Sequence, residues 1–92
     1  MLIGSLRVRL VIREARSLKD KRQVVQSIKE KLRNHFNLSV AEVAEQDHRQ
    51  VAVLGMAMVS NESQHLRKAL GQVVEALRSH PVAELVDYEI ET

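Results

Sequence analysis

The spacing of hydrophobic residues changes repeatedly along this chain, and the order of these changes limits the folds that it can adopt. From Ser5 to Arg13, hydrophobic and polar residues alternate, which is typical of a strand with one buried face. After Ser17, hydrophobic residues recur every three or four positions and predict a helix that ends near His35. Leu38–Glu45 again fits a strand, and the polar stretch EQDHRQ predicts a turn.

Three further elements complete the pattern. Val51–Val59 predicts a strand that is apolar on both faces. Asn61, with Gln64 three residues later, marks the start of a second helix, and Pro81 ends it. Val86, Tyr88 and Ile90 alternate with acidic residues and predict the last strand.

The resulting order, strand–helix–strand–strand–helix–strand, is that of an α+β, ferredoxin-like βαββαβ sandwich. A length of 92 residues suits a single ferredoxin-like domain, residues 1–92. Right-handed crossovers order the strands 4-1-3-2 in an antiparallel four-stranded sheet, with both helices on one face.

Positive charge is concentrated in the first part of the chain. Residues 1–37 hold ten Lys or Arg and three Asp or Glu, whereas residues 38–92 hold four and nine. Two interpretations stay open: an anionic partner binds the basic part, or the two parts pair within the fold. The last strand is expected beside the first, where its acids would balance the arginines of the first strand. The acids are Asp87, Glu89 and Glu91, and the arginines are Arg7, Arg9 and Arg13.

The cations of the first helix have no such expected counterpart. The amino end of a helix carries partial positive charge, and cations there are disfavoured by about 0.3–1 kcal/mol each. Cationic residues nevertheless crowd this end and continue along the helix: Arg16, Lys19, Lys21, Arg22, Lys29 and Arg33. They predict an anion-binding surface to which free backbone N–H groups contribute. The alternative is a solvated helix face, in which Asp20 and the helix cap offset the repulsion.

If the anion is a nucleic acid, its phosphates are the groups that this surface contacts. The only aromatic residues, Phe36 and Tyr88, fall on predicted core faces, so no stacking platform is expected. The chain also has no GxxG loop. Structured RNA, alone or in a ribosomal particle, fits such salt-dependent contacts better than a sequence-specific single strand.

The central strand suggests a second surface. One face of Val51–Val59 is expected to be open, and it is nevertheless apolar. With the neighbouring strand it forms a patch that favours a homodimer interface: Ala41, Val43, Val51, Val53 and Ala57. The alternatives are a shallow solvated face of small side chains, or a dimeric regulatory module that binds a small ligand or a protein there.

Residues for catalysis or metal binding are not grouped in the sequence. The chain has no cysteine, its four histidines are dispersed, and it has no nucleophile motif, P-loop or dinucleotide fingerprint. We therefore expect no metal, no cofactor and no enzymatic activity.

Arg7 and Arg9 interrupt any signal-peptide core, and no apolar run approaches the ~20 residues of a membrane helix. A cytoplasmic protein without a membrane partner is expected.

Three segments, ARSLKDKRQVV, FNLSVAEV and LGMAMVSN, resemble in order and spacing the YlxP-like family of small bacterial proteins of unknown function. The resemblance implies the ferredoxin-like fold and no catalytic residue. The family's genes often lie near those for translation initiation and ribosome maturation, including ribosome-binding factor A, which implies a connection with RNA or the ribosome. Many members have leucine–tryptophan–glutamine–arginine where this chain has His48-Arg49-Gln50-Val51, so it lacks any partner contact that the tryptophan makes.

Overall fold

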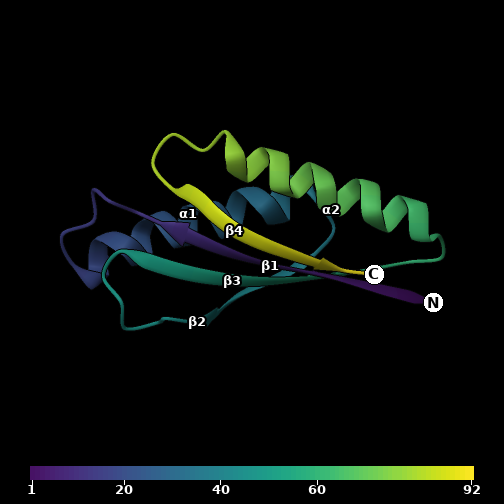
Figure 1. Cartoon of the computed structure of the whole chain (residues 1–92), viewed down its shortest axis with the longest axis horizontal. Helices are drawn as coiled ribbons and strands as arrows, with labels where there is room; N and C mark the ends of the chain where they lie inside the picture. The colour runs from purple at the N-terminus through teal and green to yellow at the C-terminus, as the bar shows by residue number, and fades with distance from the viewer.

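The computed structural model describes residues 1–92 and contains six helices and strands in the predicted order. The first three are β1 (Leu2–Val11), α1 (Leu18–His35) and β2 (Ser39–Ala44). The others are β3 (Val51–Ser60), α2 (Ser63–Arg78) and β4 (Glu84–Glu91) (Figure 1). β1 begins earlier than the alternation indicated, because it pairs with β3 along its whole length.

The four strands form one antiparallel sheet in the order β2-β3-β1-β4, and both helices lie on the same side of it (Figure 1). This is the predicted order 4-1-3-2 read from the other edge, so the ferredoxin-like prediction is confirmed. The other side of the sheet, which we call the open face, is not covered by any helix.

The hydrophobic core lies between the sheet and the helices. It contains 20 buried residues, which come from alternate positions of the strands and from one stripe of each helix. Leu54 of β3, Ile28 of α1 and Leu70 of α2 are among those at most 2% exposed. The helices are staggered along the sheet, so that they approach each other mainly through their carboxyl-terminal halves (Figure 1).

The two helices begin differently. The Ser17 hydroxyl accepts a hydrogen bond from the Asp20 amide (3.1 Å), and the Asp20 carboxylate accepts one from the Arg16 amide (3.0 Å), a variant of the capping box. The cap predicted for α2 from Asn61 is wrong. Because β3 continues through Ser60, the chain turns later and Glu62 occupies the cap position without a side-chain hydrogen bond.

Phe36 and Tyr88 were both predicted to face the core. Phe36 is partly buried and packs against the core, but Tyr88 is exposed. Tyr88 is 42% exposed, because β4 is an edge strand. The guanidinium of Arg78 lies over its ring, 5.5 Å from the centroid. The exposed aromatic side is therefore already occupied by a cation.

Histidine side chains close two of the loops. Nδ1 of His48 accepts hydrogen bonds from the amides of Gln50 and Val51, both at 3.0 Å. Nδ1 of His80 accepts from the amides of Val82 (3.1 Å) and Ala83 (2.9 Å). An Nδ1 that accepts two N–H bonds carries no proton. Burial, and secondarily the charge of Lys31, lower the pKa of His80 below its ordinary value.

This arrangement predicts a pH dependence of stability that comes from His80. The unfolded state binds more protons than the folded state below about pH 6.5, so the free energy of unfolding should fall as the pH drops through that value. His80→Asn keeps a side-chain acceptor for both amides but does not titrate. Its free energy of unfolding, measured by urea denaturation, should depend less on pH between about 7 and about 5 than that of the wild type. His65→Asn, at an exposed site on α2, should keep the wild-type slope.

Candidate anion-binding site

Lys21 belongs to the first turn of α1 but is 0% exposed. Its ammonium group donates hydrogen bonds to three main-chain carbonyls of the hairpin between β2 and β3. These are the carbonyls of Glu45, Gln46 and Val51, at 2.9, 3.2 and 3.1 Å. A lysine ammonium has three N–H donors, and all three have an acceptor here.

The charge of Lys21 is compensated by Glu42 of β2. The ammonium lies 2.9 Å from Oε2 of Glu42, whose side chain is 15% exposed. This oxygen receives no hydrogen bond, because the N–H groups of Lys21 are directed at the carbonyls, so the contact is an ion pair alone. The prediction that Lys21 belongs to the anion-binding surface is therefore wrong. Its direction on the apolar side of α1 places it against the hairpin, out of reach of an external ligand.

Sequence analysis did not single out Glu42. Its position in the sequence could have indicated it: Glu42 comes two residues after Val40 and therefore lies on the same side of β2, the side that faces the helices. A carboxylate on that side needs a buried cation, and Lys21 is the cation on the apolar side of α1.

A second set of hydrogen bonds joins the β1–α1 loop to the same hairpin. The side-chain amide of Gln50 donates to the carbonyls of Arg13 (3.1 Å) and Ala15 (3.2 Å), and the Gln50 carbonyl accepts from the Ile12 amide at 2.7 Å. Loop, hairpin and first turn of α1 therefore form one connected unit at one end of the molecule.

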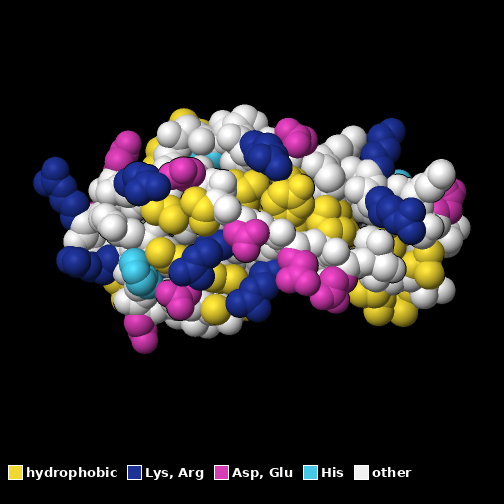
Figure 2. Space-filling view, viewed as in Figure 1, with side chains coloured by type: hydrophobic (Ala, Val, Ile, Leu, Met, Phe, Trp, Pro, Cys, Tyr) yellow, Lys and Arg dark blue, Asp and Glu magenta, His cyan; other side chains and the backbone are white.

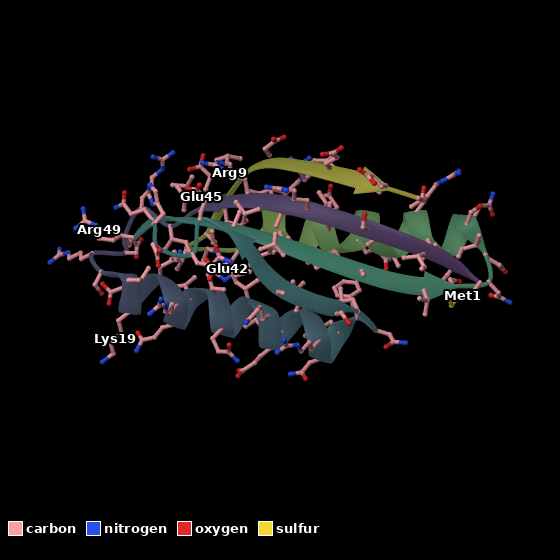
Figure 3. The ribbon with its side chains drawn as sticks, turned by 90° about the horizontal axis from the view of Figure 1, so that it is seen from below. Met1, Arg9, Lys19, Glu42, Glu45 and Arg49 are labelled. Atoms are coloured by element: carbon pink, nitrogen blue, oxygen red, sulfur yellow. The ribbon has the colours of Figure 1, made fainter.

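Four exposed cations project from this unit, and we call them the basic end: Arg16, Lys19, Arg22 and Arg49. Arg49 comes from the hairpin, and its side chain lines the same hollow as Arg16. Arg49 and Lys19 lie at the same end of the molecule, far from Met1 (Figure 3). None of the four makes an ion pair within 4.0 Å. Sequence analysis missed Arg49 because only the folded hairpin brings it beside Arg16.

The rest of the predicted basic stripe on α1 is less free. Lys29 is half-buried, and Arg33 donates to the Val40 carbonyl on the edge strand β2 at 3.3 Å. Glu30 accepts a hydrogen bond from Gln26 at 3.1 Å and lines the same surface as Lys19 and Arg22, with which it forms no ion pair within 4.0 Å. Of the predicted stripe, Lys19 and Arg22 are therefore the exposed cations of α1 whose side chains have no ion pair or hydrogen-bond partner.

The arginines of β1 lie opposite the acids of β4 as the sequence predicted, but Arg7 and Arg9 form no ion pair with them within 4.0 Å. Arg7 pairs in register with Glu89, and Arg9 with Asp87. Basic and acidic side chains lie interspersed across the middle of the molecule (Figure 2). An ion pair forms just beyond the end of β1, between Arg13 and Glu84, the first residue of β4, at 2.8 Å.

The open face is only partly the apolar patch that the sequence predicted. Ala41, Val43 and Ala57 are exposed and Val51 is half-buried, but Val53 is only 2% exposed. Val53 lies between β1 and β2 and is already covered within the single chain, so it is not available to a partner. Two further hydrophobic residues of this face are 60% exposed and lie opposite each other, Ile3 and Val59.

The structure holds no group of three or more histidine, cysteine, aspartate or glutamate side chains that could bind a metal ion. Neither helix combines the length and the apolar composition that a membrane span requires.

Four antiparallel strands in this order, with two helices on one side, define a ferredoxin-like α+β domain. A de novo designed protein with ferredoxin fold, solved by solution NMR, matches it with a TM-score of 0.57. The match covers 100% of this chain and 87% of the design at 14% sequence identity, and so supports the fold alone.

The sequence comparisons show the family. The family model described as "Protein of unknown function (DUF503)" matches residues 3–90. The "Uncharacterized protein YlxP" of Bacillus subtilis (strain 168) is 35% identical over 83 residues, 90% of each chain. The chain therefore belongs to the DUF503 family, as its resemblance to YlxP-like proteins predicted.

The buried ammonium can be tested by replacing Lys21 with Met. This variant leaves the Glu42 carboxylate without its counter-ion and three carbonyls without a donor, so the free energy of unfolding should fall by about 3 kcal/mol. Lys19→Met removes an exposed cation from the same turn and should change the free energy of unfolding by less than about 0.5 kcal/mol. Urea denaturation followed by circular dichroism measures both.

The double variant Lys21→Met/Glu42→Leu should lose less stability than its two single variants together, because neither charge is then left unpaired. If Lys21→Met is as stable as the wild type, the ion pair does not support the hairpin.

Proposed function

We propose that this protein is a non-enzymatic RNA- or ribosome-associated factor that binds structured RNA through its basic end. The observation that carries the proposal is the group of four exposed cations that make no ion pair within 4.0 Å. They gather where Lys21 and Gln50 hold the β1–α1 loop, the β2–β3 hairpin and the start of α1 together. Free cations at a helix amino end repel the helix dipole, and a bound phosphate relieves that repulsion.

The same surface can supply both kinds of donor that phosphate groups prefer. Arginine side chains from the loop and the hairpin, Arg16 and Arg49, offer paired N–H groups. The first N–H groups of α1 have no acceptor within the helix and point toward the same end; that of Asp20 is taken by the Ser17 hydroxyl, which leaves those of Leu18 and Lys19. Base stacking makes no contribution to this proposal, because the ring of Tyr88 on β4 already has the guanidinium of Arg78, from α2, over it.

Reversing the charge of Lys19 and Arg22 tests the RNA-binding proposal. Lys19→Glu/Arg22→Glu should fold normally, because acidic residues suit the amino end of a helix. Its affinity for ribosomal particles, or for a ribosomal RNA hairpin in fluorescence anisotropy, should fall at least about tenfold at low salt. The slope of log affinity against log salt concentration should become shallower by about two, since about two phosphate contacts are lost.

The matched control is Arg67→Glu/Lys68→Glu, which makes the same change in net charge on exposed positions of α2. Equal binding and an equal salt slope in wild type and the Lys19/Arg22 variant would leave the basic end as a solvated surface. Equal losses in both variants would show that only net charge matters.

We further propose that the protein forms a homodimer through the open face. In the single chain, Arg7 and Arg9 form no ion pair within 4.0 Å, although acids stand opposite them on β4. A twofold axis across this face brings the arginine row of one copy near the acidic row of the other, with the exposed apolar side chains between them.

Adjacent residues of β1 provide a matched pair for the dimer proposal. Ile3 is 60% exposed on the open face, whereas Leu2 is 41% exposed and points to the other side of the sheet. Ile3→Lys should convert the dimer to a monomer in light scattering, and Leu2→Lys should not. A wild-type protein that is monomeric at high concentration contradicts the proposal and favours a ligand or another protein at this face.

A further inference from the structure

A cleft of about 220 Å³ lies between the carboxyl-terminal halves of α1 and α2. Its walls are apolar and include Leu32, Phe36 and Leu77. It lies on the helix side of the molecule, so it is separate from the open face, and it lies at the opposite end of α1 from Arg16 and Lys19.

The polar groups that line the cleft are all basic: Lys31, His35 and His80. Nδ1 of His80 accepts two amide hydrogen bonds, so the proton of its neutral ring is on Nε2 and can be donated. Nδ1 of His35 lies 2.9 Å from the Lys31 carbonyl, to which its N–H donates. No acidic residue lines the cleft, so nothing in it neutralises the Lys31 ammonium.

We propose that this cleft binds a small amphiphilic carboxylate, with its aliphatic chain among the apolar walls and its carboxylate on Lys31 and His80. Apolar walls with a few convergent polar groups are typical of small-ligand sites. The positive charge of Lys31 selects an anion: the ammonium repels a cationic head group, and a neutral head group lacks the ionic attraction that a carboxylate has to it. The small volume selects a short chain rather than a long acyl lipid.

Octanoate is the probe, and ¹H–¹⁵N correlation spectra of the whole protein follow its binding. Octanoate should cause saturable shifts that are confined to the two helix ends, while octanol and acetate should bind at least about tenfold more weakly. Lys31→Gln should weaken octanoate binding about tenfold, because it removes the charge while a polar, slightly shorter side chain stays in place. Ala76→Phe, at an exposed position in the wall, should fill the cleft and abolish the shifts.

Lys68→Gln, on the exposed side of α2, is the control and should bind octanoate as the wild type does. The proposal is overturned by any of three results: no saturation by about 10 mM octanoate, octanol binding as tightly as octanoate, or unchanged binding in either cleft variant. Neither the RNA-binding proposal nor the dimer proposal depends on the outcome.

Discussion

The buried ammonium of Lys21 is the interaction on which the geometry of the basic end depends. It joins the first turn of α1 to three carbonyls of the β2–β3 hairpin, and Glu42 compensates its charge. A charge in a protein interior is tolerated only when it is paired and its hydrogen-bonding groups are satisfied. Because Lys21 meets both conditions, the hairpin is fixed against the helix, and Arg49 is held beside Arg16.

The basic residues of this chain therefore have three different roles. The arginines of β1 lie opposite acids of β4, Lys21 is internal, and the four cations of the basic end are exposed and make no ion pair within 4.0 Å. This division explains how a chain with a net charge of only +2 can still present a local anion-binding surface. Lys31 lies beside the apolar cleft at the other end of α1, where in our proposal it binds a small carboxylate and not RNA.

Most of the fold could be predicted from hydrophobic spacing, since strands and helices bury residues at different periods. The site was less predictable. Val53 was expected at an interface, but neighbouring strands cover it. Tyr88 was expected in the core, but β4 is an edge strand that α2 leaves partly open. In each case the alternation of residues correctly predicted which side of the sheet the side chain is on. Its exposure, however, depended on which strands and helices lie beside it.

By itself, the sequence determined the six elements, their order and the strand arrangement, because period and chain connectivity are local properties that leave few topologies. It also determined that cations gather at the start of α1. Only the tertiary structure decided which of them are available to a ligand. Lys21 pairs with Glu42 and donates to hairpin carbonyls 24 to 30 residues away, so it is not available. Arg49, from the same hairpin, lies beside Arg16 and is available. Such contacts depend on distance in space, and spacing along the chain does not report it.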